Sequence, residues 1–289
     1  MALRWTACRA LSAAWALAVA ASTGSVANSF TPTALSLPGR IPAAQVATLS
    51  SYDRTVLQDK PAGYWTSSLD VTGRGRNGKF TGKPSVAVMP NGDRAPRYDG
   101  VKQYLTIPDA RDWSVTRTGA LTVEAWLRPD TLQFPNGEGL GKGYVHWLGK
   151  GSPQNQEYVA RMYSLHSPEN RPNRISGYAF NLAGGEGAGS YFQDVVRVGQ
   201  WIHYALVINT RRVDAENPTG YVRVYKNGRL RDQDALVDYA VVPGDGTAPL
   251  RVGTRDLGSF FKGAVGKAAV YNHEVTADRL LRHYRSMTE

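Results

Sequence analysis

The chain of 289 residues has a single cysteine, Cys8, close to its N-terminus. Without a second cysteine no disulfide can form within the chain, and zinc sites or redox motifs built on several cysteines are excluded. No two histidines have the spacing of a zinc site, and no serine stands in a Gly-x-Ser-x-Gly elbow. Stability must therefore come from packing, and the common zinc and nucleophile motifs are missing.

Long hydrophobic runs are also scarce. Residues 10–21 form one alanine-rich run, which follows a basic opening with Arg4 and Arg9 and is too short to span a bilayer as a helix. Small residues that suit cleavage follow at Ala21 and Ala27. We expect residues 1–27 to be a signal peptide and the protein to be secreted, without insertion into a membrane.

Basic residues exceed acidic ones, but they do not cluster. The formal net charge is +10, and no run of four or more Lys or Arg occurs. Loss of residues 1–27 would lower this charge to +8, because Arg4 and Arg9 are the charged residues there (10 − 2). Scattered basic residues argue against nucleic acid as a partner, whereas a basic surface can attract an acidic glycan. The sequence carries no signal of oligomeric state.

Helical periodicity and internal repeats are nearly absent, and short alternating runs take their place. Strong examples are residues 120–127, 158–164, 174–181 and 263–271, with Gly, Pro, Asn or Ser between them. No repeat of about 20–50 residues is present, which excludes a propeller. These runs predict an all-β fold, a jelly-roll sandwich of two antiparallel sheets. Only the end of the chain, capped by Thr276, predicts a short C-terminal helix.

Residues 199–230 predict a long hairpin around which the sandwich is built. The run 201–208 is apolar or aromatic on both faces, so both faces of this strand must be covered. The return strand ends at Asn227-Gly228, a pair suited to a tight turn with positive φ. His203 shares a face with Trp201, and we interpret it as a packed histidine with one ring nitrogen hydrogen-bonded.

The domain organisation follows from composition. Residues 28–50 are rich in Ser, Thr, Ala and Pro and lack periodicity, which predicts a flexible linker. No second core is indicated after this segment. We therefore expect one domain over residues 51–289.

Several segments of the chain form a recognisable series in their order and spacing. They are Lys60-Pro-Ala-Gly-Tyr-Trp65, Tyr98-Asp-Gly100, Tyr104-Leu-Thr-Ile-Pro108, Leu121-Thr-Val-Glu-Ala-Trp-Leu-Arg-Pro129, Trp201-Ile-His203, Val224-Tyr-Lys-Asn-Gly228, Leu250-Arg-Val-Gly253 and Phe261-Lys-Gly-Ala-Val265. Together they resemble the laminin-G-like domains of the concanavalin A-like lectin and glucanase superfamily. The resemblance implies two packed sheets, one of them concave, with a groove that in relatives holds carbohydrate or peptide. It does not imply a single activity, because this fold carries lectins, adhesion modules, glycosidases and lyases.

Three functions are compatible with these residues. Glucanases of the superfamily carry Glu-x-Asp-x-x-Glu on one strand, and no such pattern is present. A lyase on an acidic, uronate-containing polysaccharide needs a Tyr or His base with Arg, Asn or Gln, and residues 146–194 supply these types. A protein-adhesion module would use its loops instead. We favour a carbohydrate-binding, lectin-like protein whose partner is a polysaccharide or glycan, with the lyase as the main alternative.

The predicted ligand site lies on the strands between His146 and Asp194. Aromatic rings would stack on a sugar, and polar side chains would donate hydrogen bonds to its hydroxyls or carboxylates. The candidates are Trp147, Lys150, Arg161, Tyr163, Asn181, Tyr191 and Gln193. Residues 184–189, which include four glycines, predict a flexible loop at the edge of this groove.

No cofactor is required by this interpretation, and Ca²⁺ is a further hypothesis. Asp70 lies in a glycine-rich loop and Asp99 in an Asp-Gly turn, where carboxylate oxygens can bind a hard cation. Such residues also accept local backbone hydrogen bonds. Many members of the family that the chain resembles carry an acidic pair linked to calcium where this sequence has Gly266-Lys267. Calcium at that position is therefore not expected.

Overall fold

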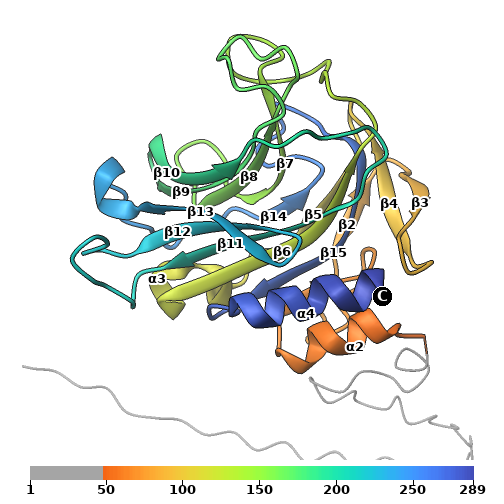
Figure 1. Cartoon of the computed structure of the whole chain (residues 1–289), viewed down its shortest axis with the longest axis horizontal. Coiled ribbons are helices and arrows are strands. Elements are labelled where there is room, and N and C mark those ends of the chain that lie inside the picture. The colour runs from red at the N-terminus through yellow and green to blue at the C-terminus, as the bar shows by residue number, and fades with distance from the viewer. Residues whose placement is uncertain (1–47) are drawn as a thin grey trace, which may run out of the picture. The chain divides into compact units, whose positions relative to one another are not determined.

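A computed structural model describes residues 48–289 (Figure 1). The predicted signal peptide and residues 28–47 of the predicted linker lie outside the described residues. Two antiparallel sheets form the body of the described chain. This confirms the predicted two-sheet, all-β fold.

One sheet has eight strands. Seven of them run in the order β13-β12-β11-β6-β15-β4-β3, and β1 pairs with β15. Their bounds are β1 (Gly63–Trp65), β3 (Ser85–Val88), β4 (Arg94–Asp99), β6 (Ala120–Pro129), β11 (Ile202–Asn209), β12 (Tyr221–Lys226), β13 (Arg229–Ala235) and β15 (Lys262–Tyr271).

The other sheet has seven strands in the order β10-β9-β8-β7-β14-β5-β2. Their bounds are β2 (Lys79–Thr81), β5 (Tyr104–Ile107), β7 (Tyr144–Lys150), β8 (Tyr158–Tyr163), β9 (Ile175–Asn181), β10 (Gly184–Phe192) and β14 (Leu250–Val252).

Helices are few and short in the described chain. The α-helices are α2 (Ser51–Gln58), α3 (Val115–Thr118) and α4 (Ala277–Thr288), and the 3₁₀ turns are η1 (Arg111–Trp113) and η2 (Leu236–Tyr239). The helix α4 is the predicted C-terminal one; Thr276 stands at its N-cap position, but its side chain makes no capping bond. Within the described residues no helix is both long and apolar enough to cross a membrane.

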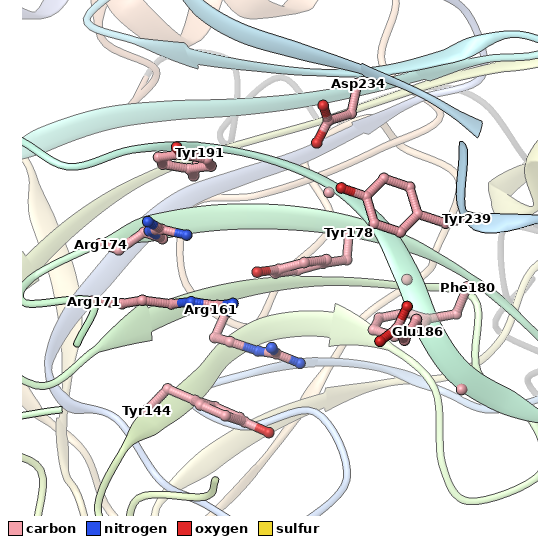
Figure 2. Close-up of a pocket in the computed structure, with 13 residues that line it drawn as sticks. Tyr144, Arg161, Arg171, Arg174, Tyr178, Phe180, Glu186, Tyr191, Asp234 and Tyr239 are labelled. Carbon is pink, nitrogen blue, oxygen red and sulfur yellow. The ribbon is translucent and has the colours of Figure 1, made fainter. Parts of the chain in front are cut away.

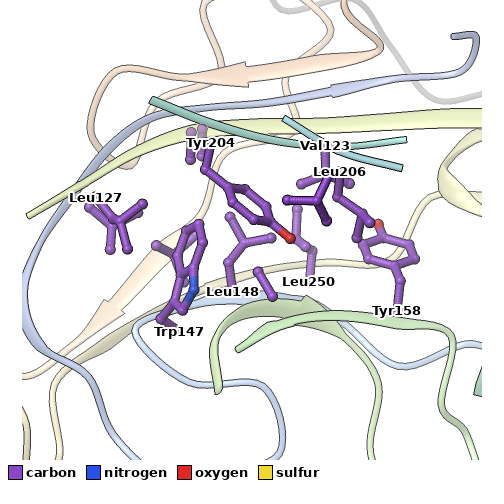
Figure 3. Packing of buried hydrophobic residues seen from close by; sticks show 14 of the residues in the cluster. Val123, Leu127, Trp147, Leu148, Tyr158, Tyr204, Leu206 and Leu250 are labelled. Carbon is purple, nitrogen blue, oxygen red and sulfur yellow. The ribbon is translucent and has the colours of Figure 1, made fainter. Parts of the chain in front are cut away.

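The main core lies between the two sheets (Figure 3). The strand β6 alternates as the sequence predicts, since Leu121, Val123, Ala125 and Leu127 enter this core. The intervening Trp126 belongs to a second cluster, together with residues of α2 and α4. Each sheet therefore has one face in the common core, and α2 and α4 cover the other face of the eight-stranded sheet (Figure 1).

The predicted hairpin is present as β11 and β12. Every residue of β11 is buried, with Tyr204 and Leu206 in the main core and Ala205 and Val207 in the second cluster. The face of β11 that points away from the main core is therefore covered by the helices α2 and α4. The turn after β12 contains Asn227 and Gly228, with φ of 53° and 74°, as the Asn-Gly pair predicts.

Candidate functional site

A polar pocket lies on the outer face of the seven-stranded sheet (Figure 2). Along β8, Ala160 and Met162 enter the main core, so Arg161 between them points to the opposite face. The pocket has a volume of about 390 Å³, which is within the usual size of ligand sites. Its lining residues are Tyr144, Arg161, Arg171, Arg174, Tyr178, Phe180, Gly185, Glu186, Gly187, Gly189, Tyr191, Asp234 and Tyr239.

Glycines in β10 make room for the rings that line the pocket. A Cβ on Gly187 would lie 2.6 Å from the Phe180 ring, and one on Gly189 would overlap the Tyr178 ring. Both rings come from β9, the neighbouring strand. The prediction of a loop at residues 184–189 is wrong, because these residues belong to the strand β10, in which Gly184, Ala188 and Gly189 pair with β9 and residues 185–187 form a bulge.

Arg161 is the central cation of the pocket. Its guanidinium lies 4.0 Å from the ring centre of Tyr144 and 4.5 Å from that of Tyr178, so it is held between two aromatic rings. Its Nη1 donates to the hydroxyl of Tyr163 over 3.2 Å, and its Nε donates to Nε2 of His146 over 3.3 Å. Burial alone lowers the pKa of Arg161, but the neighbouring tyrosines outweigh burial and raise it. The side chain is therefore a fixed positive charge.

A second arginine–tyrosine pair lies nearby. The guanidinium of Arg174 lies 3.8 Å from the ring centre of Tyr191, and its Nε donates to Oε1 of Gln193 over 3.0 Å. Tyr191 remains 40% exposed, so part of its ring is free to contact a ligand. Arg171 donates to the hydroxyl of Tyr163 over 3.0 Å. Three arginines thus converge on this side of the pocket (Figure 2).

The other side of the pocket is acidic. Glu186 comes from β10, whereas Asp234 and Tyr239 come from β13 and η2 (Figure 2). Burial, followed by the charges of Asp232 and Asp238, raises the pKa of Asp234. The pocket can therefore offer cations, an aromatic ring and carboxylate acceptors to one ligand.

The structure separates the predicted site residues into groups. Arg161 and Tyr191 line the pocket. Tyr163 is buried beneath it, where its hydroxyl joins Arg161 and Arg171. Gln193 contacts the pocket through Arg174. The side chain of Asn181 is engaged by backbone groups, since it donates to Ala240 O and accepts from Val242 N.

Two predicted site residues, Trp147 and Lys150, are wrong because both side chains are buried. Trp147 follows the regular alternation of β7, since Val145 enters the main core as well. His146 faces Arg161 of β8 whereas Leu148 faces Ala160, and this bulge reverses the side chains from Leu148 onward, including Lys150. The ring of Trp147 is fully buried and packs edge-on against Tyr204, 5.0 Å between ring centres (Figure 3). A buried ring in the core cannot stack on a sugar.

Beyond the bulge, Lys150 is also fully buried. Its Nζ pairs with Glu157 and lies 2.9 Å from Asp109, and it donates to Gly246 O over 2.6 Å. The ammonium of Lys150 is therefore occupied by internal partners.

Several pocket residues were not among the sequence candidates, notably Tyr144, Arg171, Arg174, Tyr178 and Glu186. Two signals point to them in retrospect. Tyr178 alternates with core residues of a predicted strand, and the alternate glycines 185, 187 and 189 mark one face of β10 as lacking side chains. A strand with glycine at every second position leaves space above its neighbour.

The carboxylates proposed as calcium ligands hold backbone groups of their own loops. Oδ1 of Asp70 accepts from the amides of Tyr64 and Thr72, and Oδ1 of Asp99 accepts from three successive amides, those of residues 101–103. A calcium role for either residue stays a prediction. At the position where members of the family carry an acidic pair, Nζ of Lys267 lies between Asp53 and Asp93, at 2.6 and 2.8 Å. A buried ammonium there does not fit a calcium site.

The architecture described above is a two-sheet jelly roll with a polar pocket on an outer face. Comparisons with known proteins agree with this fold. A family model described as the concanavalin A-like lectin/glucanases superfamily, of the laminin G type, matches residues 99–280, more than half of the chain. The chain belongs to this superfamily, which confirms the resemblance inferred from sequence.

Solved structures with this fold include three with bound partners. Domain 4 of an extracellular arabinanase from Geobacillus stearothermophilus, in complex with arabinotriose, aligns at 17% identity and a TM-score of 0.54, covering 78% of this chain and 98% of that domain. The ligand-binding domain of botulinum neurotoxin serotype D, in complex with N-acetylneuraminic acid, aligns at 11% identity and a TM-score of 0.56, covering 82% of this chain and 52% of that one.

A third structure is the binding domain of botulinum neurotoxin DC in complex with rat synaptotagmin II. It aligns at 11% identity and a TM-score of 0.55, covering 80% of this chain and 52% of that one. This chain therefore matches about half of each toxin domain. At these identities the likenesses show the fold alone. No curated protein matches the sequence.

Proposed function

We propose that this chain is a secreted carbohydrate-binding protein and that the pocket on the seven-stranded sheet is its ligand site. The observation that carries the proposal is the pairing of a partly exposed ring, Tyr191, with the fixed guanidinium groups of Arg161 and Arg174 in one pocket. An aromatic ring offers a flat apolar surface for the face of a sugar ring. Guanidinium groups donate hydrogen bonds to hydroxyls and bind carboxylates in two-pronged fashion.

The charge distribution favours an acidic glycan. Three arginines line one side of the pocket, and the chain as a whole carries an excess of basic residues. A uronate or similar sugar would place its carboxylate beside Arg161 or Arg174. Its hydroxyl groups could then donate to Glu186 or Asp234 on the acidic side.

Two of the related structures support carbohydrate as the ligand class. The arabinanase domain was solved with arabinotriose, and the neurotoxin domain of serotype D with N-acetylneuraminic acid. The third was solved with a protein, synaptotagmin II, and this observation favours the alternative of a protein-adhesion module. Among these alternatives the pocket chemistry favours a sugar.

The lyase alternative needs a base that faces the pocket. Burial raises the pKa of Tyr178 to about 12 despite the opposing charge of Arg161, and burial likewise raises the pKa of Tyr144. Both phenols therefore keep their protons near neutral pH. His146 is 1% exposed, and its Nε2 already accepts from Arg161. These contacts suit binding better than proton abstraction.

Glycan binding by the wild-type chain and by Arg161→Ala tests the proposal. Titrations against a panel that includes neutral oligosaccharides and uronic-acid polymers should identify a ligand, and Arg161→Ala should bind it about 10- to 100-fold more weakly, because a hydrogen bond to a charged group contributes about 1.5–3 kcal/mol. Arg285→Ala, an exposed arginine on α4, is the matched control and should bind normally. Wild-type affinity in Arg161→Ala would contradict the site assignment.

The same panel separates binding from cleavage. Ultraviolet absorbance of unsaturated products would rise with time if the chain were a lyase. We expect retained glycan binding without such a rise. Unfolding curves of each variant should show that the fold is intact.

A further inference from the structure

Next to the pocket, where His146 contacts Arg161, three potential metal ligands lie close together. Among the described residues, Glu138, His146 and Asp256 form a cluster in which one ligand atom of each lies within 4.8 Å of the others. Glu138 precedes β7, His146 lies on β7, and Asp256 follows β14. Neither the sequence motifs nor the proposed sugar site uses these two carboxylates.

The ligand atoms of this cluster lie close to one another, but no hydrogen bond of good geometry joins His146 Nδ1 to Glu138 Oε1. Nδ1 of His146 lies 3.1 Å from Oε1 of Glu138 and 3.5 Å from Oδ1 of Asp256. Despite these distances, Nδ1 and Oε1 have no hydrogen-bond partner of acceptable geometry among the described residues. His146 is 1% exposed, so an unpartnered ring nitrogen there is costly.

A metal ion accounts for this geometry. In a tetrahedral site with bonds of about 2.0–2.2 Å, ligand atoms lie about 3.3–3.6 Å apart, close to the two separations measured from Nδ1 of His146. One imidazole nitrogen with two carboxylate oxygens is a mixed donor set that suits Zn²⁺, with the fourth position left for water. We propose that Glu138, His146 and Asp256 bind a divalent transition-metal ion such as Zn²⁺.

Contacts outside the three ligands hold them in place, as around known metal sites. The second oxygen of Asp256 pairs with Nη2 of Arg255 at 2.7 Å, whereas Oδ1 accepts one long bond from the amide of Gly258 over 3.4 Å and keeps a lone pair for the cluster. The backbone of His146 donates to Oγ of Ser259 over 3.0 Å, so the loop that carries Asp256 is tied to β7. The amide of Glu138 donates to Tyr144 O over 2.6 Å. The ligands are therefore placed before any metal binds.

The cluster also touches the pocket through His146. In the structure Nε2 of His146 accepts from Arg161, which leaves the proton of a neutral ring on Nδ1. A metal ion needs the lone pair of Nδ1, so the proton must move to Nε2, where it faces the Nε–H of Arg161. Binding would therefore break this hydrogen bond, while the stacking of Arg161 between Tyr144 and Tyr178 can persist. Removal of Arg161 should then tighten metal binding, whereas it should weaken glycan binding.

Calorimetric titration of the chelator-treated full chain with ZnCl₂, without glycan, tests the proposal. We expect one equivalent of Zn²⁺ per chain, and an affinity lower by more than about 100-fold in His146→Gln and Asp256→Asn, since even the loss of an outer contact costs about 10- to 100-fold. The matched control is His166→Gln, an exposed histidine, which should bind like the wild type.

Two further variants separate loss of the metal site from loss of folding and from binding by the thiol. Glu138 is only partly buried, so Glu138→Gln should fold even if the buried His146→Gln does not, and it should lose binding too. Cys8→Ser excludes the one thiol as the ligand and should bind normally. The proposal is overturned if the wild type binds no Zn²⁺, if Glu138→Gln and Asp256→Asn bind like the wild type, or if Cys8→Ser abolishes binding. Unfolding temperatures measured with chelator would show which variants are folded.

Discussion

The two sheets of the sandwich carry polar residues on their outer faces, but one set is closed and the other is open. On the eight-stranded sheet Glu124 and His203 are fully buried under α2 and α4, together with His283. On the seven-stranded sheet, Arg161 and its neighbours line an open pocket, where none of the α-helices among residues 48–289 supplies a lining residue (Figure 2). The same strand alternation thus produces a structural network on one side and a candidate binding site on the other.

On the closed face, the carboxylate of Glu124 is fully occupied by internal contacts. Glu124 accepts from the hydroxyls of Tyr52 and Tyr271 at 3.2 and 2.9 Å, and it lies 2.7 Å from Nε2 of His203 and 2.9 Å from Nδ1 of His283. A buried carboxylate with this many partners has no capacity left for a ligand. Residues of the open face, in contrast, keep exposed surface, as Tyr191 does.

The largest expected effect comes from breaking the closed network. Glu124→Gln leaves one acceptor oxygen for several donors, and loss of one partner from a buried ionic network costs about 3–5 kcal/mol. Chemical denaturation should show this loss in the free energy of unfolding, and glycan affinity of the folded fraction should not change. Glu169→Gln, a surface carboxylate paired with Arg171, should cost less than about 1 kcal/mol. Equal losses in the free energy of unfolding for the two variants would contradict the distinction between the closed and the open face.

The closed network should also make stability depend on pH. Burial alone raises the pKa of Glu124, but His283 and His203 outweigh burial and lower it from its ordinary 4.5. Burial alone lowers the pKa of His283, but Glu124 and Asp59 outweigh burial and raise it from 6.5. The stability from Glu124 is present above pH 4.5 and is lost as pH falls toward its lowered pKa. The stability from His283 is present below pH 6.5 and is lost as pH rises through its raised pKa.

His283→Asn tests this dependence. The free energy of unfolding of the wild type should exceed that of the variant by about 2 kcal/mol between about pH 5 and pH 6, the scale of a charged hydrogen bond, and the difference should shrink at higher pH. His166→Asn, at an exposed position, should show a small difference that does not vary with pH. A constant difference for His283→Asn from about pH 5 to pH 9 would contradict the assignment of the network.

Strand alternation made most of the fold predictable from sequence. The run 120–127 predicts which residues of β6 face the core, and the Asn227-Gly228 turn predicts the end of β12. His203 is, as predicted, a packed histidine with one bonded ring nitrogen. These features depend on local periodicity and turn chemistry, which a single sequence contains.

The candidate site was only partly predictable, for two physical reasons. A bulge adds one residue to a strand and reverses all later side chains, so the alternation that holds through Trp147 misplaces Lys150. Cross-strand contacts are the second reason, because Gly187 and Gly189 make room for the Phe180 and Tyr178 rings only in the register that β9 and β10 adopt as a bulged hairpin. The bulge leaves no periodic signal, and the alternate glycines indicate free space without indicating which rings occupy it.

The smallest expected effect compares two residues on the same face of one chain segment. Tyr191 lines the pocket, whereas Gln193, two residues later, contacts it only by accepting from Arg174. Tyr191→Ala should weaken glycan binding about tenfold, because an aromatic contact adds about 0.5–1.5 kcal/mol beyond the area it buries. Gln193→Ala should weaken it less than about threefold, since one exposed neutral hydrogen bond contributes about 0.5 kcal/mol. Titration of both variants with the same glycan would place the edge of the site between them, and a larger loss in Gln193→Ala would move that edge outward.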